Sequence, residues 1–344
     1  QAILAQVKRA RDHSRGAPPS SPSCPLSAMA AAATNVHVDW TPLEEPQAAP
    51  RQLDPSQAHS PPIVSDVVTQ RGTVVCLSRA SLSDAVDLLI MHDRTAAGVV
   101  DDQGSLQGVL TENDMVVAYG SDVPAGTAVR SWLKSGFARL PGSELPEQMV
   151  RSSTTLLEAA VRMRSHVDSE TSCHHLVVRD EEGAFHGVLS SLDLARAVCS
   201  LQQLRGATVS EVMKPRADVP QCSPSTPLGD AVRRMSEAHQ NCVLVTGEDD
   251  EVLGVVTPRD ALRAFSEHVP LSVDVGHWLR ALQERWEPRQ VTAAAQVAEA
   301  ASVMAEGLLH HLIVVSPASF RVVGVLSTLD LARALAADRD MVVC

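Results

Sequence analysis

From Ile63 onward, the chain alternates between short apolar runs and stretches whose apolar residues recur with helical spacing. Four of these stretches place apolar residues at i, i+3, i+4 and i+7, which is the spacing of one helix face. The four faces are Leu82-Ala85-Val86-Leu89, Leu156-Ala159-Ala160-Met163, Leu228-Ala231-Val232-Met235 and Val297-Ala300-Ala301-Met304. An apolar strand is predicted after each helix, at 97–100, 176–178, 243–245 and 312–315. The pattern therefore predicts four similar units.

A second apolar strand in each unit runs into the motif Gly-apolar-apolar-Ser/Thr-x-x-Asp. The hydroxyl residue and the carboxylate of the four copies are Thr111 and Asp114, Ser190 and Asp193, Thr257 and Asp260, and Ser327 and Asp330. Successive aspartates are 79, 67 and 70 residues apart. A regular period of this kind is the signature of a repeat. Each unit thus reads strand, helix, strand, strand, helix, and we expect the last helix to begin near the aspartate.

This order and this motif resemble the cystathionine-β-synthase (CBS) domain, in four consecutive copies. The resemblance implies an α/β (α+β) fold of β-α-β-β-α repeats, at 63–128, 129–205, 206–270 and 271–344. The segments before the first and third copies, 64–69 and 209–215, resemble the opening phrase of the family, and those at 129–134 and 275–280 resemble each other. The resemblance further implies two modules, 63–205 and 206–344, packed as a flat disc with clefts between paired repeats.

The Ser/Thr-x-x-Asp motif has two interpretations. As structure, it is a capping box, in which the hydroxyl and the carboxylate bind the backbone N–H groups of the helix start and contribute about 1 kcal/mol. As a site, a helix N-terminus in a cleft can bind phosphate. The resemblance implies that the aspartate holds the ribose of an adenine nucleotide and that the hydroxyl lies by the phosphate. We expect ligand contact first at Asp330, Ser327, Asp193 and Ser190, and second at the histidines described below. Asp260, Thr257, Asp114 and Thr111 are further candidates.

Paired histidines precede the middle strand in the second and fourth units, at His174-His175 and His310-His311. Neighbouring strand residues point to opposite faces, so one pair does not suit a metal ion. In the γ subunit of AMP-activated protein kinase, which has the same layout, the matching residues are His-Arg and contact phosphates. Histidine is mostly neutral at pH 7, so phosphate binding should be weaker and depend more on pH, unless Arg94 or Arg289 supplies the cation.

Composition narrows the class of protein. The 344 residues carry a formal net charge of −12, which argues against nucleic acid or anionic lipid as partners. No apolar run reaches the roughly 18 residues that a membrane span needs. The seven scattered cysteines indicate free thiols in a reducing compartment, so we expect a soluble protein of the cytoplasm or nucleus.

The segment 1–62 is rich in Pro, Ser, Ala and Gln and is predicted to be disordered. It begins at Gln1 rather than Met, so we expect a chain truncated upstream. An organellar targeting peptide is the less favoured alternative.

The sequence contains no nucleotide-binding P-loop, nucleophile elbow, zinc-protease or kinase catalytic motif, so we expect no enzyme. The resemblance implies a regulatory, energy-sensing subunit that binds AMP, ADP or ATP, holds no tightly bound cofactor or metal, and signals to a protein partner such as a kinase complex. A homodimer is a further expectation. The alternatives are a ligand-free scaffold in a larger assembly and a sensor of S-adenosylmethionine.

Overall fold

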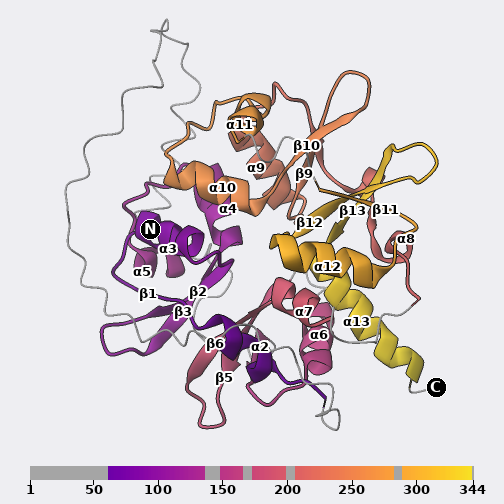
Figure 1. Cartoon of the computed structure of the whole chain (residues 1–344). Helices are drawn as coiled ribbons and strands as arrows, with labels where there is room; N and C mark the ends of the chain where they lie inside the picture. The colour runs from indigo at the N-terminus through magenta and orange to yellow at the C-terminus, as the bar shows by residue number, and fades with distance from the viewer. Residues whose placement is uncertain (1–60, 136–147, 166–172, 199–205, 283–288, 343–344) are drawn as a thin grey trace, which may run out of the picture.

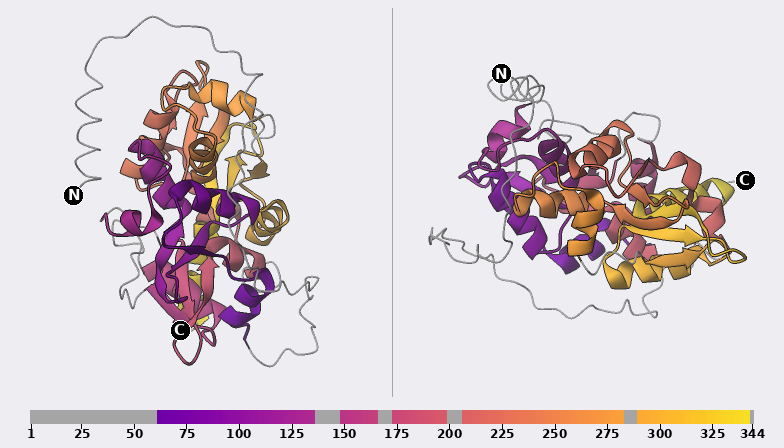
Figure 2. Two further views of the ribbon diagram at one scale, coloured as in Figure 1. Left: turned by 90° about the vertical axis from the view of Figure 1, so that its left-hand side faces the viewer. Right: turned by 90° about the horizontal axis from the view of Figure 1, so that it is seen from above.

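The structure, a computed structural model, describes residues 61–135, 148–165, 173–198, 206–282 and 289–342. Four copies of one unit lie around a common centre (Figure 1), and the body is flattened when seen edge-on (Figure 2). Each copy has the predicted order strand, helix, strand, strand, helix. The predicted fold class is therefore confirmed. The boundaries between the repeats stay predictions. Residues 1–60 of the segment 1–62, for which disorder was predicted, lie outside the described residues.

The elements of the four repeats are as follows. Repeat 1 contains β1 (Val75–Leu77), α3 (Leu82–Met91), β2 (Ala96–Val100), β3 (Leu106–Thr111) and α4 (Glu112–Gly120). Repeat 2 contains β4 (Met149–Arg151), α6 (Leu156–Ser165), β5 (His175–Arg179), β6 (Phe185–Ser190) and α7 (Ser191–Val198). Repeat 3 contains β8 (Gln221–Cys222), α9 (Leu228–Glu237), β9 (Val243–Thr246), β10 (Val252–Val256) and α10 (Pro258–Ser266). Repeat 4 contains β11 (Gln290–Thr292), α12 (Val297–Gly307), β12 (His311–Val315), β13 (Val322–Ser327) and α13 (Thr328–Val342).

Each repeat folds into a small mixed sheet. The first strand pairs in parallel with the second, and the second pairs antiparallel with the third, as in β1-β2-β3 and β4-β5-β6. The sheet of repeat 4 gains a fourth strand, because β7 (Lys214–Pro215) pairs with β13. The second and third strands form a hairpin, so the start of one lies beside the end of the other. This register places the residue before each middle strand next to the Ser/Thr-x-x-Asp motif.

The predicted helix faces form the core. All sixteen residues of the four faces are at most 1% exposed. One apolar cluster joins repeats 1 and 3, where α4 contacts α9 and α10, and a second joins repeats 2 and 4, where α13 contacts α6 and α7. Within the modules the sheets meet: β2 contacts β6, and a third cluster, which includes Ile313, Val315 and Val325, joins repeats 3 and 4. Among the described residues, the cysteines at 76, 173, 222 and 242 are free thiols, and all four are buried.

The lead-in segments are exchanged within each module, which the sequence did not reveal. Helix α2 (Val64–Arg71) precedes repeat 1 but packs on repeat 2, where the Val64 N–H donates to the Thr154 carbonyl at 2.8 Å. Helix α8 (Val209–Val212) packs on repeat 4 in the same way. Conversely, α5 (Val129–Leu133) packs on repeat 1 and α11 (Val275–Ala281) on repeat 3. Repeats 2 and 4 are thus completed by the segment that precedes their partner repeat, and repeats 1 and 3 by the segment that follows them in the chain.

This exchange explains three of the four motif glycines. A Cβ at Gly187 would lie 2.5 Å from a methyl of Val68 in α2, and one at Gly254 would lie 2.9 Å from a methyl of Leu279 in α11. A Cβ at Gly324 would lie 2.5 Å from the carbonyl oxygen of Lys214 in β7. The glycine at the head of the motif therefore leaves room for the docked lead-in segment.

Gly324→Ala is expected to lower the free energy of unfolding by about 2 kcal/mol, because the added methyl meets backbone, which cannot swing aside. Chemical denaturation measures this. Gly126→Ala is the matched control, since nothing lies within 4 Å of its added Cβ, and it should leave stability within about 0.5 kcal/mol. Equal effects of the two substitutions would contradict the packing of β7 on β13.

Candidate functional site

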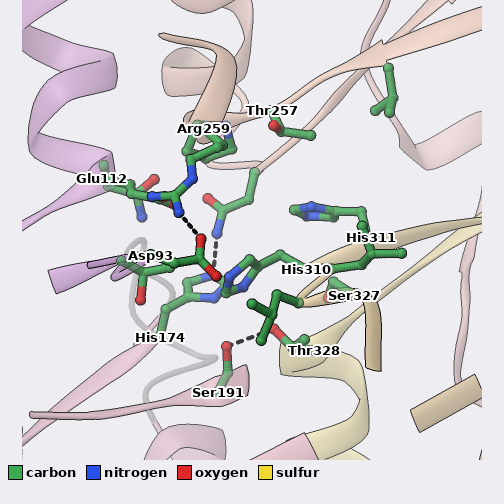
Figure 3. Close-up of a pocket in the computed structure, with 18 of the residues that line it drawn as sticks. Asp93, Glu112, His174, Ser191, Thr257, Arg259, His310, His311, Ser327 and Thr328 are labelled. Atoms are coloured by element: carbon green, nitrogen blue, oxygen red, sulfur yellow. Dashed lines mark hydrogen bonds and ion pairs between the residues drawn. The ribbon is translucent and has the colours of Figure 1, made fainter. Parts of the chain in front are cut away.

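A cavity of about 630 Å³ lies at the centre of the ring, and all four repeats line it (Figure 3). Each repeat contributes a residue near the start of its middle strand: Thr95, His174 and His310 directly before the strand, and Asn241 two residues before it. In three repeats the carbonyl of this residue accepts a hydrogen bond from the first residue of the last helix, at 2.9–3.0 Å. In repeat 3 that helix begins with Pro258, which has no N–H to donate. The repeat symmetry therefore delivers four equivalent positions to one cavity.

Four helices also begin at this cavity. The first residues of α4, α7, α10 and α13 all line it: Glu112, Ser191, Pro258 and Thr328. The Ser191 and Thr328 hydroxyls share a buried hydrogen bond of 2.8 Å that joins repeats 2 and 4. The first N–H groups of these helices are engaged by carbonyls or, at Pro258, missing, so the helices offer the cavity mainly the partial positive charge of their dipoles. Their convergence makes the centre of the ring favourable for an anion.

The structural interpretation of the motif is confirmed in all four repeats. The carboxylate of each aspartate accepts hydrogen bonds from the backbone N–H of the Ser/Thr three residues earlier, at 2.7–2.9 Å, and from its hydroxyl, at 2.6–2.7 Å. Asp114 and Asp260 have no exposed surface, whereas Asp193 and Asp330 keep 4% and 7%. Of the four predicted hydroxyl residues, Thr257 and Ser327 line the central cavity.

Asp114 is covered by a residue that the sequence did not single out as part of a site. The Nε1–H of Trp132 in α5 donates to Asp114 Oδ1 at 3.3 Å, and the indole is fully buried. The carboxylate of repeat 1 thus has its second oxygen engaged by the docked lead-in segment. In this arrangement Asp114 acts as a structural group.

Asp330 lies in a second, smaller cleft between repeats 3 and 4, with a volume of about 40 Å³. Lys214, Val219, Val325 and Arg333 also line it. Burial raises the pKa of the Asp330 carboxyl, although the hydrogen bonds from Ser327 and the charges of Arg333 and Lys214 act in the opposite direction. The cleft joins the central cavity through shared lining residues, namely His174, Asn241, His311 and Ser327.

The four predicted histidines come together at the cavity. His175 Nε2 shares a hydrogen bond of 2.8 Å with Thr95 Oγ1, and His174 Nε2 lies 2.6 Å from the amide nitrogen of Asn241. Burial lowers the pKa of His175 to about 4. Burial, with His175, His311, Arg333 and His310 as neighbours, lowers the pKa of His174 well below its usual value. Sequence reasoning treated each pair alone; the structure brings pairs from repeats 2 and 4 to one place.

Arginines complete the lining. Arg289, one of the two cations considered from the sequence, lines the cavity, whereas the guanidinium of Arg94 donates to the Gly72 carbonyl at 3.2 Å and Arg94 is not part of the lining. Sequence reasoning missed Arg259 and Arg263, which also line the cavity. The signal was available, because Arg259 is the second residue of the helix that opens at Thr257 and Arg263 lies one turn further on. Among the described residues, no three His, Cys, Asp or Glu side chains gather in a way that would hold a metal ion.

Comparisons with known proteins agree with this architecture. The family model of the CBS domain matches residues 64–121, 144–200, 209–267 and 285–337. A crystal structure of a protein from Methanocaldococcus jannaschii, described as a proposed archaeal homologue of the γ subunit of AMP-activated protein kinase, superposes with a TM-score of 0.62. It is 13% identical and covers 79% of this chain and 99% of that one.

Two further proteins match this chain over most of its length or over a short segment. An uncharacterised conserved protein from Pyrococcus horikoshii superposes with a TM-score of 0.50 at 18% identity, over 77% of this chain and 96% of that one. A protein of Chlamydia muridarum named only as uncharacterised is 39% identical over 59 residues, which are 17% of this chain and 18% of that protein. Within the described ranges, no helix has both the length and the apolar character that crossing a bilayer requires.

Proposed function

The chain belongs to the CBS-domain family, and from this premise we propose that it is a non-catalytic regulatory protein that binds an adenine nucleotide at the centre of its ring of four repeats. Ligand binding shifts the balance between two arrangements of the repeats. A protein partner, such as a kinase complex, reads this shift. Such a signal requires that the ligand bind the two arrangements with different affinity.

The observation that carries the proposal is the convergence of anion-binding groups on one cavity. Four helix N-termini, the histidine pairs and the guanidinium groups of Arg259, Arg263 and Arg289 all meet there. The volume of about 630 Å³ is within the range of small-molecule sites, roughly 300–1,000 Å³. Phosphate is the group that suits both the helix ends and the arginines.

The cleft beside Asp330 is the best place for the nucleoside. The Asp330 carboxylate is suited to accept hydrogen bonds from two vicinal sugar hydroxyls, and the side chains of Val219 and Val325 can contact the apolar faces of a base. The cleft is small, so a nucleoside that enters it displaces the Lys214 and Arg333 side chains. That displacement couples ligand binding to movement of β7 and α13. By the same logic Asp193, with Ser190, is the second candidate, whereas Asp114 and Asp260 stay within their capping boxes.

Two other functions have a specific observation in their favour. The mixture of carboxylates and guanidinium groups in the cavity, with Asp93 and Glu112 beside Arg259, also suits the amino-acid end of S-adenosylmethionine. The two fully buried motif aspartates favour a ligand-free scaffold in which the repeats serve as an interaction surface. One ligand screen separates the three.

Thermal unfolding of the full chain with AMP, ADP, ATP, ATP with Mg²⁺ and S-adenosylmethionine tests the proposal. A ligand at a hundred times its Kd adds about 2.7 kcal/mol of stability, which is a shift of several degrees. We expect AMP to raise the unfolding temperature. In Asp330→Asn the apparent affinity for AMP should fall at least about tenfold, because the amide cannot accept hydrogen bonds from both sugar hydroxyls as the carboxylate does.

Asp260→Asn is the matched control, because Asp260 makes the same capping bonds but has no exposed surface. It should lose a similar amount of stability and keep its affinity for AMP. A shift with S-adenosylmethionine alone would identify that ligand instead. No shift with any of the five would favour the scaffold.

A further inference from the structure

The charges around the central cavity are divided between the two modules. Repeats 3 and 4 contribute the guanidinium groups of Arg259, Arg263 and Arg289. Repeat 1 contributes two carboxylates, Asp93 and Glu112. A cavity that binds an anion is therefore lined on one side by groups that repel it.

The two carboxylates hold one of the arginines (Figure 3). Arg259 Nη1 lies 3.0 Å from Glu112 Oε1 and donates to the Arg94 carbonyl at 3.0 Å, while Arg259 Nη2 forms an ion pair with Asp93 Oδ1. The Arg259 and Glu112 side chains are 14% and 9% exposed, so water screens this group weakly. We call Arg259, Asp93 and Glu112 the Arg259 clasp. It joins repeat 3 of one module to repeat 1 of the other.

The two carboxylates are not held equally firmly. Glu112 is the first residue of α4, where the helix dipole favours a negative charge. Asp93 follows the C-terminus of α3, where the dipole disfavours one, and its side chain is 44% exposed. Asp93 is therefore the weaker partner and the one that an incoming anion displaces first.

A phosphate and the clasp compete for the same guanidinium. Arginine binds carboxylate and phosphate in the same forked geometry, and phosphate carries more charge. A phosphate that reached Arg259 with both carboxylates in place would lie beside two like charges in a partly buried site. Binding at Arg259 and persistence of the clasp therefore oppose each other.

We propose that Asp93 and Glu112 act as a built-in counter-ion for Arg259, which an anionic ligand must displace, so that ligand binding opens a link between the two modules. The proposal rests on the proposed function, because it concerns the same cavity. According to this proposal, Asp93 and Glu112 lower the affinity of the cavity for its anionic ligand. The proposal also identifies the contact between repeats 1 and 3 as the place where binding changes the arrangement of the modules.

The test is isothermal titration of the full chain and of the double variant Asp93→Asn with Glu112→Gln, with AMP and separately with inorganic pyrophosphate. The amide side chains keep the shape of the clasp and remove its charge. We expect the variant to bind both anions about tenfold more tightly, which is the size of one charge-assisted interaction. Without ligand, the variant should unfold at a lower temperature, and saturating ligand should reduce that difference.

Asp87→Asn is the control. Asp87 accepts a hydrogen bond of 2.6 Å from the Ser266 hydroxyl and links the same two repeats, but it is not part of the cavity lining. It should leave both affinities unchanged, which separates loss of charge in the cavity from a loosened interface. Equal or weaker binding of AMP by the double variant, with wild-type protein that binds AMP, would refute the clasp and leave the proposed function intact.

Inorganic pyrophosphate tests the clasp independently of the proposed nucleotide function. Tighter binding of pyrophosphate by the double variant, with no binding of any adenosyl ligand by either protein, would support the clasp and refute the nucleotide function. Failure of both proteins to bind either anion would overturn both.

Discussion

Trp132→Ala is expected to lower the free energy of unfolding by about 3–5 kcal/mol, the usual cost of removing a fully buried tryptophan. The indole fills the interior of repeat 1 from the docked helix α5, and its N–H donates to the buried Asp114 carboxylate. Removing it leaves both a cavity and a buried carboxylate oxygen that has lost a donor. Urea-induced unfolding followed by circular dichroism measures the change.

The phenylalanine variants separate the two contributions. Trp278 in α11 stands at the same place in repeat 3 and is 4% exposed, but its indole nitrogen has no hydrogen-bond acceptor among the residues the structure describes. Trp132→Phe and Trp278→Phe lose similar volume, and only the first loses a hydrogen bond to a charged group. We expect Trp132→Phe to cost about 1–2 kcal/mol more than Trp278→Phe. Equal costs would mean that the bond to Asp114 contributes nothing to stability.

The sequence predicted correctly those features that depend only on residues close together in the chain. The helix face Leu82-Ala85-Val86-Leu89 repeats its spacing in four places, and a face with that spacing has to be buried whatever covers it. The capping boxes were predictable for the same reason, because Ser327 and Asp330 are three residues apart and bind each other's backbone. Both predictions depend on contacts within one turn of helix.

Contacts between distant segments were not predictable. The exchange of α2 and α8 between repeats leaves no trace in the local pattern, because each helix would look the same on either partner. The motif glycines carried a hint: Gly324 marks a close approach by another backbone, but it does not say which segment approaches.

The composition of the central cavity was also not predictable, because it depends on contacts between distant segments. The histidine pairs were visible in the sequence, but their meeting depends on how repeats 2 and 4 pack. Arg259 was passed over because the carboxylates that hold it are more than a hundred residues away, in repeat 1. Aligning the four motif copies by position would have singled it out, since Arg259, Asn113, Leu192 and Leu329 are equivalent and it alone is charged.

Acidification is expected to destabilise the protein through His175 in the absence of any anionic ligand. Burial lowers the pKa of this imidazole from its usual value of 6.5 to about 4 in the folded chain. Between these two pH values the unfolded chain binds a proton that the folded chain does not, so stability falls as the pH falls through this window. The full loss is about 3 kcal/mol, of which about 2 kcal/mol should already be lost at pH 5. Above pH 6.5 this contribution is constant.

His175→Gln isolates the effect, because glutamine can keep the hydrogen bond to Thr95 but does not titrate. Denaturant titrations of both proteins at pH 7 and pH 5 should show that the variant loses about 2 kcal/mol less between the two pH values. The carboxylates of the chain titrate alike in both proteins and cancel in the comparison. Equal losses would mean that His175 does not carry the acid sensitivity.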